Sequence, residues 1–173
     1  GETVAFVGPS GAGKTTIIQM ILRFYDPQSG RITFDGIDLR DLKRDAFRRQ
    51  IAIVPQDPVI FAASARENIR FGRPDATDAE IESAARAAAA HDFISALPDG
   101  YDSYVGERGV MLSGGRKQRV AIARAIVQEP RLLVLDDALS AVDTHTEASI
   151  LAALRMNGHD AKSAPTKIIV AHR

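Results

Sequence analysis

The chain has 173 residues, of which 45 % are apolar and 25 % are charged, and these values are typical of one ordinary globular domain with a buried core. Lys plus Arg and Asp plus Glu both number 22, so the formal net charge is zero, which argues against a protein that binds nucleic acid through a basic excess. The absence of cysteine excludes disulfides, Cys-ligated zinc and thiol catalysis, and no apolar run approaches the ~20 residues of a membrane-spanning helix.

Strands and helices alternate in the first third of the chain. Thr3–Val7 predicts a short apolar strand that leads into a glycine-rich stretch at residues 8–13, and residues 14–25 carry apolar side chains at helical spacing. Residues 31–34 alternate between polar and apolar types before an Asp-Gly turn, and Ile51–Val54 predicts another short strand. Because the sequence opens without an initiator Met or a signal-peptide pattern, we expect a segment of a longer protein.

The middle of the chain predicts an α-helical insertion. Thr77 followed by Glu80 fits a capping box, and the Ala-rich run after it strongly favours helix. Ser113 predicts the cap of a second long helix. The insertion then covers residues 62–129.

The α/β pattern resumes after the insertion. Residues 132–135 form a continuous apolar run of the kind that a buried parallel strand shows, residues 144–155 predict a helix, and residues 167–171 predict a β-branched strand. We therefore predict an α/β protein in which residues 1–61 and 130–173 build a core around a parallel sheet.

Residues 8–15 read GPSGAGKT and match G-x-x-x-x-G-K-[ST], the phosphate-binding P-loop. Glycines let successive backbone N–H groups surround phosphate oxygens at a helix start, where the helix dipole favours anions. In this motif the lysine reaches the β- and γ-phosphates and the next hydroxyl ligates Mg²⁺, so ATP and Mg²⁺ are the expected ligands. A chance glycine turn is the alternative, but the position between a strand and a helix favours phosphate binding. The predicted nucleotide-binding residues of this loop are Gly8, Pro9, Ser10, Gly11, Ala12, Gly13, Lys14, Thr15 and Thr16.

A carboxylate follows the apolar run at residues 132–135. Asp136 is expected at the carboxyl edge of the sheet, where ligands bind in open α/β folds and where it can hold Mg²⁺, commonly through water. An Asp after a strand is by itself more often a turn residue or a helix cap. Together with the phosphate loop, Asp136 predicts a P-loop NTPase, a class that also includes kinases, GTPases and helicases.

A third motif narrows this class. Residues 112–119 read LSGGRKQR, and this segment resembles the signature LSGGQ of the ABC (ATP-binding cassette) family. An ordinary capped helix with a basic first turn is the alternative. The resemblance implies a P-loop NTPase (RecA-like) core. It also implies that Ser113, Gly114 and Gly115 contact the γ-phosphate bound by a second ABC nucleotide-binding domain, so that two chains enclose two nucleotides.

Further motifs occur in the family's order. Gln56 lies where the family has its Q-loop glutamine, SAVD at residues 140–143 is similar to the D-loop, a subunit-contact segment, and His172 matches the switch histidine that senses the γ-phosphate. A lone His at a strand end is more often structural. The resemblance covers essentially the whole chain. It places the metal ligands at Thr15, Gln56 and Asp136. It places the catalytic groups at Lys14, Gln56, Asp137 and His172.

Two segments indicate the subtype. YVGERG at residues 104–109 resembles the exporter X-loop, which lies against the transmembrane domain, and the segment after Gln56 is also exporter-like. A solvated charged surface is the alternative for both. The resemblance implies an ATPase motor that drives substrate efflux, with a transmembrane domain as partner, at the cytoplasmic face of a plasma or inner membrane. It also implies truncation at both ends, because the family's adenine-stacking aromatic residue would precede Gly1.

The sequence departs from the family at two positions. Asp137 replaces the Glu that polarises the attacking water, and Arg116 replaces the Gln of the signature. Because the shorter side chain withdraws the carboxylate by ~1.5 Å, we expect nucleotide binding to persist while hydrolysis slows. Such an Asp often marks the weakly hydrolysing subunit of a heterodimeric exporter, which is the alternative function. A soluble ABC ATPase that acts on DNA or ribosomes is disfavoured by the neutral charge and by the short distance between the first motif and the signature.

Overall fold

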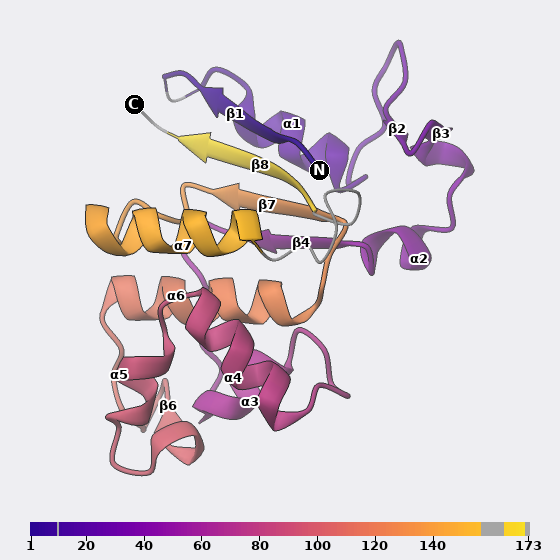
Figure 1. Ribbon diagram of the computed structural model, residues 1–173. Helices are drawn as coiled ribbons and strands as arrows, with labels where there is room; N and C mark the ends of the chain where they lie inside the picture. The colour runs from indigo at the N-terminus through magenta and orange to yellow at the C-terminus, as the bar shows by residue number, and fades with distance from the viewer. Residues whose placement is uncertain (10, 157–164, 172–173) are drawn as a thin grey trace.

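The computed structural model describes residues 1–9, 11–156 and 165–171. At its centre lies a four-stranded sheet in which all neighbouring strands are parallel (Figure 1). In spatial order the strands are β1 (Thr3–Val7), β8 (Thr166–Ala171), β7 (Leu132–Asp136) and β4 (Ile51–Val54). The predicted α/β fold with a parallel sheet is confirmed.

The register of the sheet brings the carboxyl ends of its strands to one edge. Val7 of β1 lies opposite Ala171 of β8, and Val170 of β8 lies opposite Asp136 of β7. β4 continues the same parallel register beside β7. The loops that follow β1, β4 and β7 therefore leave from a common edge, and these loops carry the predicted nucleotide-binding motifs.

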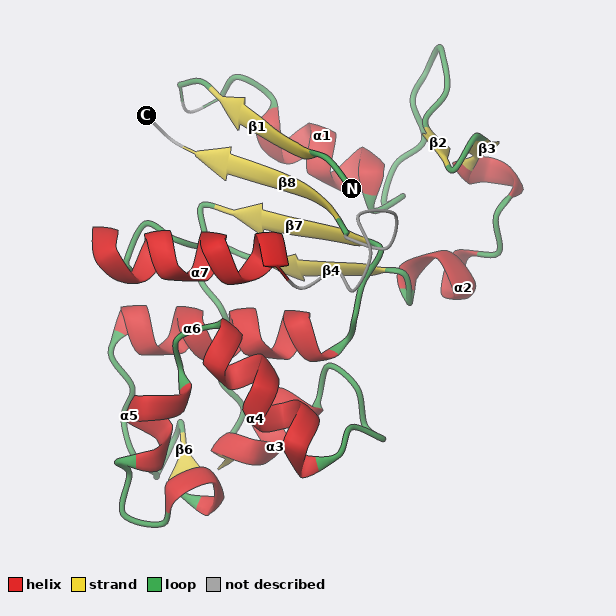
Figure 2. Ribbon diagram, viewed as in Figure 1, coloured by secondary structure: helices red, strands yellow, loops and turns green. Residues whose placement is uncertain are grey.

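Helices cover both faces of the sheet (Figure 2). One face is covered by α1 (Lys14–Ile21), and Phe47 of α2 (Arg44–Arg48), which lies before β4, packs into the same cluster. The other face is covered by α6 (Gly114–Val127) and α7 (Thr144–Met156). Alternate residues of β7 point to opposite faces, as the pleat of a strand requires. Leu132 and Val134 pack with the first pair of helices, and Leu133 and Leu135 pack with the second pair.

The first helix ends earlier than its apolar pattern predicts. α1 stops at Ile21, and Arg23 follows in the left-handed conformation with a φ of 56°. The Phe24 N–H then donates to the Gln19 oxygen at 2.9 Å, and the Arg23 N–H donates to the Met20 oxygen at 3.0 Å. This pair of bonds is a Schellman motif, in which Arg23 occupies the position that glycine usually fills. The sequence therefore carries no glycine to mark the end of the helix.

The predicted helical insertion ends with α6. Its other helices are α3 (Ala65–Arg70), α4 (Asp78–Ala87) and α5 (His91–Ser95). The short elements of the described chain are β2 (Thr33–Phe34), β3 (Ile37–Asp38), β5 (Ala63–Ser64), β6 (Tyr104–Val105), and the 3₁₀ turns η1 (Leu39–Asp41) and η2 (Gly100–Asp102).

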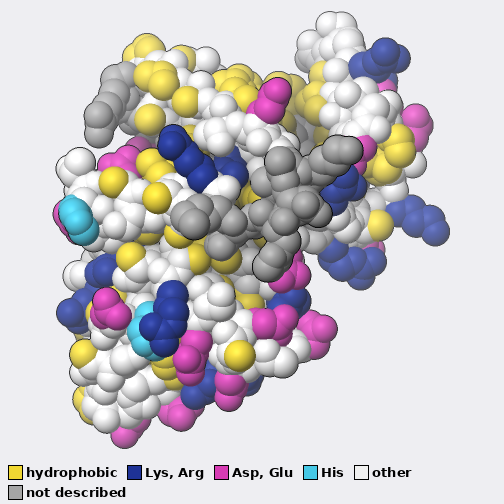
Figure 3. All heavy atoms as spheres, viewed as in Figure 1, with side chains coloured by type: hydrophobic (Ala, Val, Ile, Leu, Met, Phe, Trp, Pro, Cys, Tyr) yellow, Lys and Arg dark blue, Asp and Glu magenta, His cyan; other side chains and the backbone are white. Residues whose placement is uncertain are grey.

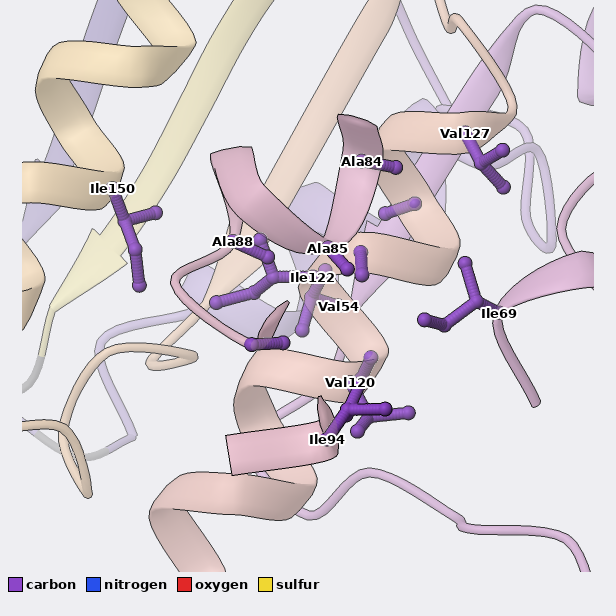
Figure 4. Packing of buried hydrophobic residues seen from close by; sticks show 14 of the residues in the cluster. Val54, Ile69, Ala84, Ala85, Ala88, Ile94, Val120, Ile122, Val127 and Ile150 are labelled. Carbon is purple, nitrogen blue, oxygen red and sulfur yellow. The ribbon is translucent and has the colours of Figure 1, made fainter. Parts of the chain in front are cut away.

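α6 joins the helical insertion to the sheet. Val120 and Ile122 of α6 belong to one buried cluster with Val54 of β4, Ile69 of α3 and Ile150 of α7 (Figure 4). α4 enters the same cluster largely through alanines, whose small side chains let two helices approach closely. The boundaries of the insertion stay a prediction. The shared cluster means that the helix with the signature motif packs directly on the sheet with the phosphate loop.

The surface of the helical insertion carries charges of both signs (Figure 3). Asp78 at the start of α4 pairs with Arg66 at 2.9 Å and with Arg70 at 2.6 Å, and both arginines lie on α3. Arg73 pairs with Glu129 at 2.9 Å. Exposed ion pairs of this kind contribute about 0–1 kcal/mol each, so these pairs help to orient the helices while the apolar cluster holds them together.

The capping box predicted at the start of α4 is present. The Thr77 N–H donates to Glu80 Oε2 at 2.7 Å, and the Glu80 N–H donates to Thr77 Oγ1 at 3.3 Å. A second box, which we did not predict although Ser64 and Glu67 have the same spacing, lies at the start of α3, where these residues exchange the same two bonds at 3.4 and 3.1 Å. Both boxes satisfy N–H groups that a helix start leaves without intrahelical partners.

We expect Glu80→Gln to weaken the fold in a pH-dependent way. The pKa of Glu80 is lowered from 4.5 to about 2, first by the hydrogen bond from the Thr77 N–H, next by the Thr77 hydroxyl and then by Arg73. Because the folded pKa lies below the unfolded one, the carboxylate stabilises the fold above pH 4.5, and this contribution is lost as the pH falls toward 2.

Urea unfolding of the chain over this pH range measures the effect. The difference in unfolding free energy between wild type and Glu80→Gln should shrink as the pH falls. Glu82→Gln, on the same helix, controls for the loss of one negative charge. A difference that does not change with pH would contradict the prediction.

Candidate functional site

The glycine-rich loop joins the carboxyl end of β1 to the start of α1 (Figure 1). Gly11 and Gly13 have φ values of 82° and 90°, in the left-handed region that residues with a Cβ rarely adopt. Within the described chain, a Cβ on either glycine would meet no atom within 4 Å. Backbone conformation, and not lack of space, therefore requires glycine at both positions. Since Gly13 is the N-cap of α1, the first N–H groups of the helix are directed toward the loop, where an anion can bind.

The Lys14 side chain lies inside this loop. Lys14 is only 6 % exposed, and its Nζ donates to the backbone oxygens of Gly8 at 2.5 Å and Pro9 at 2.8 Å. Both of these acceptors are neutral, so they leave the positive charge of the ammonium group available to an anion. Thr15 and Thr16, which follow on α1, are exposed. The loop thus combines a cation, helix N–H groups and accessible hydroxyls, which is the chemistry that phosphate and Mg²⁺ require.

Two carboxylate residues lie at the same edge of the sheet as this loop. Asp136 is the last residue of β7, which is separated from β1 by β8 alone. Asp137 follows with a φ of 50°, and its N–H donates to the Val170 oxygen at 2.9 Å. The backbone oxygen of Asp137 accepts bonds from the Ser140 N–H at 3.2 Å and from the Ser140 hydroxyl at 2.8 Å. These bonds form a tight turn that keeps both carboxylates at the carboxyl edge.

Gln56 follows β4 at the same edge. Gln56 is exposed, and its backbone oxygen accepts a bond from Gln118 Nε2 at 3.2 Å. Two predicted site residues, Ser10 and His172, lie outside the described residues. The strand before His172, β8, ends at the same edge as β1. The topology thus gathers the phosphate loop, Gln56 and the two carboxylates at one edge of the sheet.

The signature residues lie at the start of α6, away from the phosphate loop. Ser113 is the N-cap residue, as predicted, but within the described chain its side chain accepts no capping hydrogen bond. The third helical position is Arg116, so this position has no acidic side chain to accept a bond from the Ser113 N–H, as a capping box requires. Ser113 and Gly114 are exposed. Since α1 and α6 cover opposite faces of the sheet, a single chain does not bring the two motifs together (Figure 1).

Sequence reasoning missed two polar residues of α6. Gln118 is 3 % exposed, and its side-chain amide forms hydrogen bonds with the backbone of both Gln56 and Ala141. Arg124 donates to the oxygens of Asn68 at 2.8 Å and Val59 at 2.9 Å, and its guanidinium group lies 4.7 Å from the centre of the Phe61 ring. Burial lowers the pKa of Arg124. The sequence signal that could have indicated both residues is a polar side chain within the apolar pattern of a predicted helix.

A cavity of about 820 Å³ lies at the opposite edge of the sheet. Leu132, Thr166 and Ile168, near the amino ends of β7 and β8, line it together with Phe34 and Phe47. Because these residues lie at the other ends of the strands, the cavity is not part of the predicted nucleotide site.

The donor atoms at the carboxyl edge suit Mg²⁺. The Thr15 hydroxyl, the Gln56 amide oxygen and the Asp136 carboxylate are all oxygen donors, which Mg²⁺ prefers over nitrogen or sulfur. Mg²⁺ usually keeps several waters and binds one or two carboxylates together with substrate phosphates. In the described part of the chain, no three His, Cys, Asp or Glu side chains form a metal cluster of their own. The residues therefore fit a metal that arrives with a phosphate ligand.

Comparison with known proteins decides the family. The pattern of the family described as ABC transporter matches residues 1–140. This match contains the phosphate loop, the Gln56 segment, the signature and both carboxylates in that order. The chain belongs to the ABC transporter family.

Individual relatives of this ABC transporter chain are similar over its whole length. ABC transporter B family member 1 of Arabidopsis thaliana is 54 % identical over 173 residues, which are 100 % of this chain and 13 % of that protein. The mitochondrial potassium channel ATP-binding subunit of Mus musculus is 51 % identical over 174 residues, covering 100 % of this chain and 24 % of that protein. A solved structure of a bacterial Atm1-family ABC exporter with ATP bound is 51 % identical, with a TM-score of 0.91, over 100 % of this chain and 30 % of that chain.

These findings confirm the resemblance to ABC exporters and the fold inferred from it. The ABC transporter chain spans less than a third of the length of each of these relatives. Among the helices of the described residues, none is both long and apolar enough to cross a membrane.

Proposed function

We propose that this chain is the part of an ABC exporter that binds and hydrolyses Mg-ATP. We further propose that it pairs with a second ABC nucleotide-binding domain around two ATP molecules and so drives substrate efflux. The observation that carries this proposal is the single sheet edge that combines a glycine loop, the buried Lys14 ammonium group and the two carboxylates Asp136 and Asp137. The similarity to an exporter whose solved structure has ATP bound supports it.

The other proposed partner is a transmembrane domain, in the same or an associated chain. Two of the relatives are an ABC transporter and an ABC exporter, and this chain spans only a part of each. We place the chain at the cytoplasmic face of a plasma or inner membrane, and we do not expect it to bind nucleic acid.

In the proposed site, the backbone N–H groups of the glycine loop (other than at Pro9, which has none) and the Lys14 ammonium group bind the phosphates of ATP. The Thr15 hydroxyl and the side-chain oxygens of Gln56 and Asp136 hold Mg²⁺. The metal ion, when bound, neutralises charge on the phosphate oxygens. Positioning and charge stabilisation then provide most of the rate enhancement.

Hydrolysis requires a positioned water molecule. The Asp137 carboxylate orients this water and accepts its proton as the water oxygen bonds to the γ-phosphorus atom. The bond between that phosphorus atom and the bridging β-phosphate oxygen breaks, and this yields ADP and phosphate. His172 contacts the γ-phosphate, and residues 113–115 complete the nucleotide site of the facing domain.

One observation favours a second function. Asp137 stands where the family has a Glu, so the chain can also be a weakly hydrolysing, nucleotide-gated subunit of a heterodimeric exporter. In that case its signature residues serve a partner domain that carries the catalytic Glu. A soluble ABC ATPase is less well supported, because the relatives described above include an ABC transporter and an ABC exporter.

Mg-ATP turnover by the membrane-embedded full-length protein tests the proposal, with Lys14→Ala as the blank. Turnover clearly above the blank supports a hydrolysing motor. Turnover at the blank level, with ATP binding retained in equilibrium dialysis, supports the heterodimeric alternative. If the wild-type protein neither hydrolyses nor binds ATP, both proposed functions are contradicted.

A further inference from the structure

One buried side chain connects the start of the signature helix to two loops of the proposed nucleotide site. Gln118 lies in the second turn of α6 and is 3 % exposed. Its Nε2 donates to the backbone oxygen of Gln56 at 3.2 Å, and its Oε1 accepts a bond from the Ala141 N–H at 3.2 Å. The two ends of one amide group therefore hold two segments that are far apart in the sequence.

A second contact presses the same segment against α6. A Cβ on Gly115 would lie only 2.6 Å from the Ala141 oxygen, so the backbone of Ala141 rests directly on the first turn of the helix. Ala141 is thus held through its oxygen side by close packing and through its N–H by Gln118. The position of Ala141 relative to the signature residues is therefore determined through both peptide groups that flank its Cα.

The held segments both lead to proposed catalytic groups. Gln56 is itself a proposed ligand of Mg²⁺. Ala141 follows Ser140, whose N–H and hydroxyl both bond the Asp137 oxygen, at 3.2 and 2.8 Å. A displacement of Ala141 therefore acts on the turn that carries Asp137 through a single intervening residue.

The chemistry of an amide suits this position better than any other side chain of its size. A buried donor or acceptor without a partner is costly, and the amide satisfies one backbone oxygen and one backbone N–H at the same time. Glutamate can accept from the Ala141 N–H but cannot donate to Gln56, and methionine has a similar length but can do neither well.

We propose that Gln118 is a positioning residue that holds the turns of Gln56 and Asp137 in fixed relation to the signature start of the same chain. This inference rests on the proposed ATPase function. In the proposed dimer, Gln56 and Asp137 serve the chain's own nucleotide, whereas the signature serves the facing one. Gln118 therefore joins the catalytic groups of one site to the binding groups of the other.

The test uses the membrane-embedded full-length protein and the variants Gln118→Met and Gln118→Glu. Gln128→Met is the matched control, because Gln128 caps the other end of α6 and its Nε2 donates to the oxygen of Ile51 at 2.9 Å, at the start of β4. Its Nε2 also donates to the oxygen of Arg49 at 3.3 Å, so removing this amide deletes two side-chain bonds of the same helix to backbone oxygens, remote from the carboxyl edge.

We expect Gln118→Met to lower kcat about 10-fold while KM for ATP changes less than about 2-fold, because loss of two buried hydrogen bonds misplaces groups that act in the transition state. Gln118→Glu should lower kcat at least as much, since its second oxygen faces the Gln56 oxygen. Gln128→Met should lose similar thermal stability but keep its kcat. An equal loss of kcat in Gln118→Met and Gln128→Met, or an effect on stability alone, would overturn the proposal.

Hydrogen exchange separates this inference from the proposed function. The Ala141 amide should exchange faster in Gln118→Met than in wild type and Gln128→Met, whether or not the protein hydrolyses ATP. If wild-type turnover equals that of Lys14→Ala, the ATPase function fails. Exchange then decides by itself whether Gln118 holds the Ala141 segment, and unchanged exchange refutes that role.

Discussion

Asp137→Glu should raise Mg-ATP turnover of the full-length protein by about 10- to 100-fold. The added methylene extends the carboxylate by ~1.5 Å toward the position that the family's Glu occupies, and a misplacement of ~1 Å near the reacting atoms can cost about 100-fold in rate. ATP binding should change little, because the phosphate loop is untouched. Steady-state turnover at saturating Mg-ATP is the measurement.

The backbone conformation of Asp137 affects the expected stability of Asp137→Glu. Asp137 has a φ of 50°, and an aspartate tolerates this left-handed conformation better than most residues because its short side chain can bond locally. Glu is expected to cost a fraction of the roughly 1–2 kcal/mol that the left-handed conformation imposes on residues in general. Asp137→Glu should therefore be faster but slightly less stable to thermal unfolding.

Asp137→Asn is the control for the role of the carboxylate. It preserves the size of the side chain and its tolerance of a positive φ, but it removes the base, so residual turnover should fall to the level of Lys14→Ala. If Asp137→Asn hydrolyses ATP as fast as wild type, the measured turnover does not depend on this carboxylate. That result would contradict the role assigned to Asp137.

Gly72→Ala should destabilise the fold by about 2–3 kcal/mol or more, which is at the upper end of the range for overpacking. Gly72 follows α3 at the point where it meets α6. A Cβ there would lie 2.0 Å from the Arg124 oxygen, 3.0 Å from the Arg124 carbonyl carbon and 3.1 Å from Val127 Cγ1. Two of these atoms belong to the backbone of α6, so no side-chain rotation relieves the overlap.

The matched control is Gly114→Ala, whose new Cβ would lie an ordinary 3.8 Å from the Ala141 Cβ. Because alanine favours helix more than glycine does, this change at the start of α6 should keep or raise stability. Urea unfolding of the chain measures both variants. Equal stability of the two variants would contradict the close approach of Gly72 to α6.

Much of the fold could be predicted from sequence because the signals are local. The apolar run at residues 132–135, the strand Thr3–Val7 and the capping box at Thr77 each depend on residues within a few positions of one another. The glycine loop belongs to the same group, since glycine is the residue type that permits the left-handed φ values found at Gly11 and Gly13. The phosphate-site residues of the loop stay predictions, and the structure adds that Lys14 is buried among the loop's carbonyl oxygens.

The tertiary structure alone decided what contacts between distant segments determine. The requirement for glycine at position 72 comes from the backbone of a helix more than fifty positions away, and the bridge made by Gln118 joins residues 56 and 141. α1 stops at Ile21 without a glycine, and the left-handed Arg23 that follows donates from its side chain to the oxygens of Leu42 and Arg40, far along the chain. The separation of the signature from the phosphate loop likewise follows from the sheet, since its two faces hold α1 and α6 apart. In each case the deciding atoms belong to another part of the chain, so they cannot be predicted from the composition and periodicity of the local sequence.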